Sequence, residues 1–132
     1  MTAQRRGNTM SLKIAIKRAY EPAAKSDGRR ILVDRLWPRG VKRDTAGIDE
    51  WMKDVAPSTA LRRWFAHDPA RWKEFIGRYR KELASPAVMP AIERLRKLAS
   101  GRKVTLVYAA ADSEHNNAVA LRTILGARTA RK

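Results

Sequence analysis

The residues best suited to chemistry lie in two short stretches, each of which follows an apolar run. The first stretch contains Asp34, Arg35, Trp37 and Arg39, directly after the run 31–33. Paired guanidinium donors can grip a phosphate or a carboxylate, and the tryptophan offers a ring face to a base or a sugar. We therefore expect Arg35, Trp37 and Arg39 to bind an anionic small molecule.

The second stretch follows the apolar run 103–108 and contains groups that can orient or transfer a proton. Asp112, Ser113, His115, Asn116 and Asn117 lie here. Because histidine titrates near neutral pH, we predict that His115 acts as a general acid or base, with Asp112 or Asp34 orienting its ring. We expect Ser113 and Asn116 to contact the ligand. Helix capping is the alternative role for Ser113.

The pattern of apolar residues predicts strands before both stretches and helices between and after them. Strands are expected at 12–16, 30–33 and 103–108 because of alternating or β-branched apolar residues. Caps and helical spacing predict helices over the following segments: 49–55, 59–65, 68–83, 85–101 and 112–125. This order predicts an α/β domain with a small, largely parallel sheet flanked by helices.

A parallel sheet would bring the two polar stretches together. Ligands of open α/β sheets lie outside the carboxyl ends of the strands, and the N-terminus of the last helix would favour an anion there. We also expect that helix to hold His115 in its first turn and to lower its proton affinity. The alternatives are an ordinary ion pair between Asp34 and Arg35 and a core position for Trp37.

Length and composition set the expected number of domains and argue against cysteine, metal, cofactor and membrane functions. The 132 residues fit a basic arm at 1–10, a single domain at 11–126 and a basic tail at 127–132. There are no cysteines, which excludes disulfides and cysteine nucleophiles, and the two histidines lack close ligand spacing. We expect no metal and, without a glycine-rich phosphate loop, no cofactor. No segment has membrane-spanning length, so a cytoplasmic protein without a membrane partner is expected.

The charge balance supports a second hypothesis. Lys and Arg number 29 against 13 Asp and Glu, a formal net charge of +16, which attracts polyanions. The aromatic residues between Trp64 and Tyr79 alternate with arginines and could stack bases. Their helical spacing is more typical of core positions. A basic nucleic-acid-binding module without catalysis is therefore the alternative to a small-molecule site.

Several motifs resemble one protein family. These are DRLWPRG at 34–40, APSTALRRWFAHDPARW at 56–72, VTLVYAAAD at 104–112 and HNNA at 115–118. They are similar to the YeaO-like branch of the domain-of-unknown-function family 488. The resemblance implies a Rossmann-like α/β domain of unestablished function. The wider family often has Cys-His-Arg where this chain has His115, Asn116 and Asn117, so cysteine chemistry is not expected.

These observations favour an α/β protein with an anion site at the strand ends. A hydrolase or transferase acting on a nucleotide-like substrate fits the pattern, with Asp34, Asp112 and His115 as its catalytic groups. A subunit that binds a partner without chemistry is a third possibility. No pattern in the sequence specifies an oligomeric state.

Overall fold

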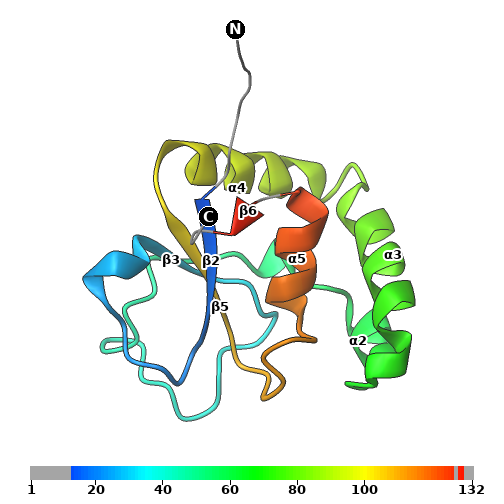
Figure 1. The fold of residues 1–132 in the computed structure, drawn as a ribbon, viewed down its shortest axis with the longest axis horizontal. Coiled ribbons are helices and arrows are strands. Elements are labelled where there is room, and N and C mark those ends of the chain that lie inside the picture. Colours follow the sequence, from blue (N-terminus) through cyan, green and yellow to red (C-terminus); the bar gives the residue numbers. More distant parts are fainter. Residues whose placement is uncertain (1–12, 127, 130–132) are drawn as a thin grey trace, which may run out of the picture.

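The computed structural model describes residues 13–126 and 128–129. The expected arm at 1–10 and most of the expected tail at 127–132 lie outside the described residues. Within them, every strand pairing is parallel and one sheet has the order β4-β3-β5-β2-β6 (Figure 1). The strands are β2 (Lys13–Arg18), β3 (Arg29–Leu32), β4 (Glu50–Trp51), β5 (Val104–Tyr108) and β6 (Arg128–Thr129).

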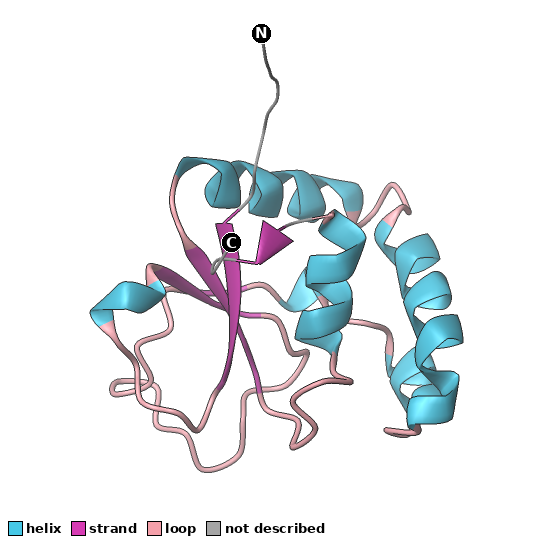
Figure 2. Ribbon diagram, in the orientation of Figure 1, coloured by secondary structure: helices cyan, strands magenta, loops and turns pink. Residues whose placement is uncertain are grey.

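Four α-helices accompany this sheet in the described part of the chain: α2 (Thr59–Phe65), α3 (Trp72–Leu83), α4 (Met89–Gly101) and α5 (Asn117–Leu125). Single turns of 3-10 helix lie at Lys25–Asp27, Lys53–Val55 and Pro69–Arg71. Figure 2 shows α3 and α5 together on one side of the sheet. The predicted α/β class with a small parallel sheet is confirmed.

Strand β5 occupies the centre of the sheet, between β2 and β3. Val104 pairs in register with Ile14 on one side and with Arg29 on the other. All five residues of β5 are buried, as expected for a parallel strand covered on both faces. Because β2, β3 and β5 run in the same direction, the loops that follow them emerge at one edge of the sheet.

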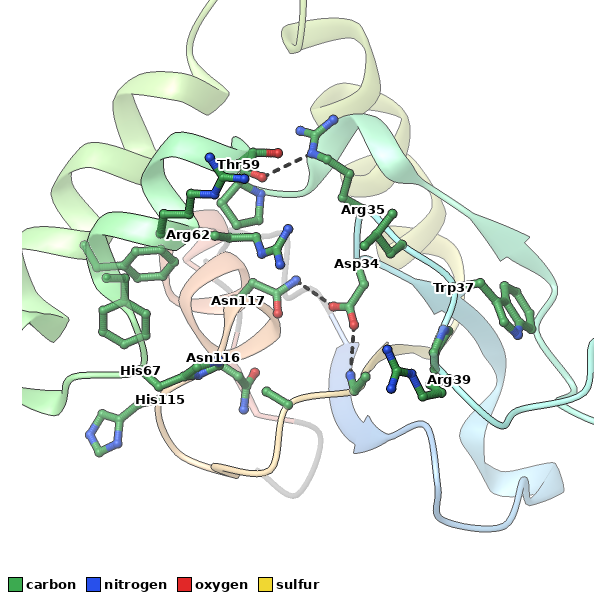
Figure 3. A pocket seen from close by; sticks show the side chains of 18 of the residues that line it. Asp34, Arg35, Trp37, Arg39, Thr59, Arg62, His67, His115, Asn116 and Asn117 are labelled. Carbon is green, nitrogen blue, oxygen red and sulfur yellow. Dashed lines mark hydrogen bonds between the residues drawn. The ribbon is translucent and has the colours of Figure 1, made fainter.

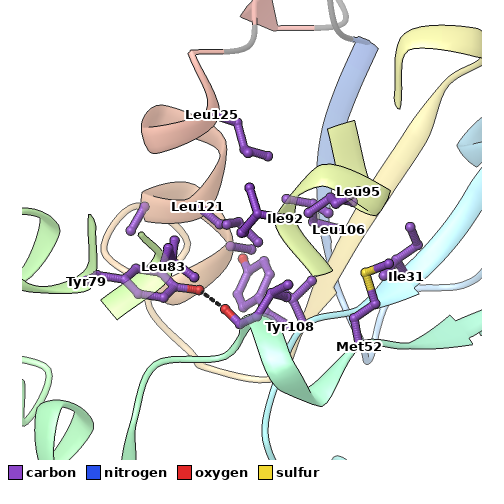
Figure 4. Close-up of a cluster of buried hydrophobic side chains, with 14 of the residues drawn as sticks. Ile31, Met52, Tyr79, Leu83, Ile92, Leu95, Leu106, Tyr108, Leu121 and Leu125 are labelled. Carbon is purple, nitrogen blue, oxygen red and sulfur yellow. Dashed lines mark hydrogen bonds between the residues drawn. The ribbon is translucent and has the colours of Figure 1, made fainter. Parts of the chain in front are cut away.

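The core lies between the sheet and the helices (Figure 4). The predicted apolar face of the segment 68–83 is confirmed, because Phe75, Tyr79 and Leu83 of α3 are all buried. Tyr79 donates a hydrogen bond from its hydroxyl to the backbone oxygen of Val55, and its burial raises the pKa of the phenol. This bond satisfies a polar group that would otherwise be costly inside the core.

The helix predicted at 49–55 is wrong. Glu50–Trp51 form the short edge strand β4, and a 3-10 turn follows. The amide of Asp49 donates to the oxygen of Arg30, and the amide of Met52 donates to the oxygen of Leu32. Pairing with β3 therefore takes the backbone groups that a helix would need, although the side chains have helical spacing.

Two predicted helix starts are also wrong. The helix expected from residue 85 begins at Met89, because Ser85 accepts backbone bonds from Val88 and Met89 in a preceding turn. The helix expected from residue 112 begins at Asn117, where Asn116 is the N-cap and accepts a bond from the amide of Val119. Within the expected tail, Arg128–Thr129 form β6 and pair with β2.

Candidate functional site

A cavity of about 620 Å³ opens at the carboxyl ends of β2, β3 and β5 (Figure 3). We call it the strand-end cavity. The loops after these strands, helix α2 and the start of α5 form its walls. Six of the residues expected from the sequence line it: Asp34, Arg35, Trp37, Arg39, His115 and Asn116. Asp112 and Ser113, which were also expected, are not among its lining residues.

Asp34 joins three elements at the inner end of the cavity. Its Oδ2 accepts from the amide of Ala109 at 2.9 Å, and its Oδ1 accepts from Nδ2 of Asn117 at 3.0 Å. Burial raises the pKa of the Asp34 carboxyl, and the bonds from Asn117 and Ala109 and the charge of Arg62 oppose that rise. The carboxylate thus connects β3 to the loop after β5 and to α5.

Asn117 was expected only as a member of the polar stretch after β5, and no role in the site was predicted for it. Its Nδ2 donates to the oxygen of Val33 at 2.9 Å as well as to Asp34. Because the last helix was expected to begin at Asp112, residue 117 was placed in its second turn rather than at its first position. The signal that could have found it is the pair of asparagines in HNNA, since Asn is a preferred N-cap and marks a helix start.

The cavity is cationic. Among the described lining residues, Asp34 has the single carboxylate, and there are four arginines: Arg35, Arg39, Arg62 and Arg63. Arg35 donates to the backbone oxygens of Ala56 at 3.2 Å and Pro57 at 3.4 Å, which holds the segment that leads into α2. Arg39 also lines the cavity and is exposed.

Arg62 and Arg63 were not expected to belong to the site, and both are exposed. They lie on α2, which begins as predicted: Ser58 caps it by accepting from the amide of Leu61 at 3.0 Å. Ser58 in turn donates to Glu82 of α3. The adjacent arginines after a cap were visible in the sequence, but the packing that brings α2 beside the strand ends was not.

His115 and Asp112 form a side-chain pair at the edge of the cavity. Nδ1 of His115 lies 3.0 Å from Oδ2 of Asp112. Oδ1 of Asp112 accepts from the amides of Glu114 and His115, and the bond from Glu114, followed by that from the histidine ring, lowers the pKa of Asp112. The prediction that His115 lies in the first turn of the last helix is wrong, because α5 begins two residues later.

Two of the expected ligand-binding residues, Trp37 and Asn116, have structural contacts of their own, and a third, Ser113, lies outside the cavity. Trp37 donates to the oxygen of Val41 and packs edge-on against Trp51, with ring centres 5.5 Å apart. Asn116 is buried and caps α5. Ser113 is exposed and does not line the cavity. The ion pair between Asp34 and Arg35, which was the alternative to a ligand site, is not among the ion pairs of the described residues.

His67 reaches the cavity from an unusual backbone turn. Ala66 and His67 both have positive φ angles, 49° and 56°, directly after α2. Residues other than glycine rarely adopt this left-handed conformation, and such strain often marks functional sites.

In the described residues we find no group of three or more acidic or histidine side chains arranged to hold a metal.

The fold and the cavity define a class: a small parallel α/β protein with a cationic cavity at the carboxyl ends of its strands. The chain belongs to the DUF488 family, because the family model described as "Inactive DUF488-N3 subclade" matches residues 13–132. The uncharacterized protein YeaO of Escherichia coli is 42% identical over 110 residues, which cover 83% of this chain and 94% of YeaO. The expected YeaO-like membership is confirmed.

An uncharacterized protein of Mycobacterium tuberculosis is 40% identical over 116 residues, 88% of this chain and 96% of the relative. No solved structure matches the chain. No helix among the described residues has both the length and the apolar character needed to cross a membrane.

Proposed function

We propose that this protein binds a small phosphate- or carboxylate-bearing molecule in the strand-end cavity without transforming it. The observation that carries the proposal is the charge of the lining, where four arginines face one carboxylate among the described residues. Both oxygens of that carboxylate already accept bonds inside the protein. The guanidiniums of Arg39, Arg62 and Arg63 are exposed, so they can bind an anion from solvent.

Binding without chemistry accounts for more observations than catalysis does. A hydrolase or transferase would use Asp112 and His115 for proton transfer, and Asp34 as a further acid. However, Asp112 is not among the lining residues, and Asp34 already ties three elements together. The family model that matches the chain also carries the word "inactive" in its description.

Thermal unfolding with and without phosphorylated compounds tests the proposal. We expect phosphate, pyrophosphate and small sugar phosphates to raise the melting temperature of the wild type in a saturable way. Arg39→Ala and Arg62→Ala should each remove most of this increase. Arg102→Ala is the matched control: Arg102 is exposed and precedes β5, at the opposite edge of the sheet.

Two results would contradict the proposal. One is a wild type that no anion stabilises. The other is an equal loss of stabilisation in Arg102→Ala and Arg62→Ala, since that would mean anions act on the overall charge rather than in the cavity.

A nucleic-acid-binding surface on α2 and α3 is the second candidate. The guanidiniums of Arg71 and Arg78 lie 5.2 Å and 4.2 Å from the ring centre of Trp64. This arrangement gives a cationic and aromatic surface of the kind that stacks unpaired bases. Binding of a single-stranded oligonucleotide should weaken steeply with salt and should depend on Trp64. The absence of binding at low salt would exclude this candidate.

A further inference from the structure

We propose that the ligand of the strand-end cavity is a nucleoside monophosphate, with its phosphate among the arginines and its base against Tyr20 and Leu36 at the mouth. This inference rests on the anion-binding function proposed above and names the ligand of the same site. It follows from the apolar part of the cavity, which a simple anion would not use.

Exposed apolar side chains gather at this cavity. Among the described residues, three large apolar side chains are exposed: Tyr20, Leu36 and Met89. Two of them, Tyr20 with 47% and Leu36 with 69% of its surface exposed, line the strand-end cavity. They come from the loops after β2 and β3, so the sequence separates them and the parallel sheet brings them to one mouth. Apolar surface left open beside a cavity indicates an apolar part of a ligand.

Tyr20 is held as a platform rather than left free. Its hydroxyl donates to the backbone oxygen of Arg39 at 2.8 Å, which ties the ring to the loop after β3. The guanidinium of Arg18 lies 4.8 Å from the ring centre. An aromatic ring fixed in this way, with a cation at one face, can stack a planar base at low entropic cost.

The interior of the cavity also matches such a ligand in size and character. The volume of about 620 Å³ falls within the usual range for small-molecule pockets. Phe65 and Phe75 also line the cavity and add apolar walls, and both are buried. Inorganic phosphate would leave most of this volume and the exposed mouth unfilled. A nucleoside monophosphate has a phosphate for the arginines, a sugar for the interior and a planar base for the ring at the mouth.

Calorimetric titration of the full-length protein with two ligands tests this inference. Adenosine monophosphate and ribose 5-phosphate share the phosphate and the sugar and differ by the base. We expect the wild type to bind the nucleotide at least about fivefold more tightly, the lower end of what stacking on an aromatic ring contributes. Tyr20→Phe keeps the ring but loses the bond that fixes it, so it should keep a reduced preference for the nucleotide, whereas Tyr20→Ala should bring the ratio close to one.

The outcomes separate this inference from the function on which it rests. If both ligands bind the wild type with equal affinity, the cavity binds anions but the base has no place in it, and the inference fails alone. If the ratio is the same in Tyr20→Ala as in the wild type, the base does not stack on Tyr20 and the inference also fails. If neither ligand nor inorganic phosphate binds, the proposed function fails together with it.

Discussion

Replacing Asn117 with aspartate tests the connection that shapes the cavity. Nδ2 of Asn117 lies 3.0 Å from Oδ1 of Asp34 and donates to it. In Asn117→Asp an oxygen takes the place of this donor, so two carboxylates face each other across the same distance. At 3.0 Å and an effective dielectric constant of roughly 20, two like charges repel by about 5 kcal/mol.

The loss of stability should depend on pH, because the pair can take up a proton. At about pH 8 we expect Asn117→Asp to lose about 5 kcal/mol of unfolding free energy. At about pH 5 adding a proton to an ordinary aspartate costs only about 1.5 kcal/mol, so the loss should shrink to about 2 kcal/mol. In this variant the repulsion between the two carboxylates raises the pKa of the pair in the folded state. The folded state therefore holds more protons than the unfolded state, and the free energy of unfolding falls as pH rises.

Urea unfolding across this pH range measures the effect, and Asn116→Asp is the matched control. Asn116 is the neighbouring residue and the N-cap of α5, where an aspartate still accepts from the amide of Val119. Asn116 is buried, so this aspartate loses the bond from Nδ2 to the oxygen of Asp112 and the hydrogen bond with Tyr108 and also buries a charge. That charge faces the free amides at the start of α5 and no second carboxylate bonded to it, so the loss at about pH 8 should be smaller than in Asn117→Asp. An equal loss in the two variants, or a difference that does not shrink with acidification, would refute the bridging role of Asp34.

Three further predictions concern the framework around the cavity. Tyr79→Phe should lose about 1–3 kcal/mol in urea unfolding, because it leaves the buried oxygen of Val55 unsatisfied; an effect as small as that of the exposed Tyr20→Phe would contradict this. Ala66→Gly should gain about 1 kcal/mol, since glycine adopts the positive φ without strain, and a loss would argue against the left-handed turn. Burial opposes but does not outweigh the bonds from Lys17, a backbone amide and Arg30, so the pKa of Asp27 is lowered. The stabilisation from Asp27 should therefore be present above its ordinary pKa and be lost as pH falls through the lowered pKa. Asp27→Asn should abolish this fall of the unfolding free energy at acid pH, measured by urea unfolding.

The strands and most helices could be predicted because their signals are local. The run 103–108 is apolar and β-branched, and Ser58 and Asp68 accept the backbone bonds that a cap requires. The segment 49–55 could not be predicted, because its conformation depends on the backbone of β3. The start of α5 was misplaced because Asp112 does accept bonds from the amides of Glu114 and His115, although it closes only a local turn there.

The same difference explains which parts of the site were found. Arg35, Trp37 and Arg39 directly follow a strand, and the parallel order of the sheet is enough to place them at its carboxyl edge. Arg62 and His67 belong to α2 and its end, and only the packing of that helix brings them to the cavity. Residues that a distant element contributes carry no signal in a single sequence, whereas residues at strand ends do.

A titration followed by amide NMR tests the central claim most directly. When phosphate is added to the ¹⁵N-labelled protein, we expect saturable shifts at the cavity amides, above all those of Arg39, Ala110 and Asn117, and no comparable shift at Arg102. Shifts that do not saturate and that spread evenly over the exposed lysines and arginines would contradict the claim that the strand-end cavity binds an anion.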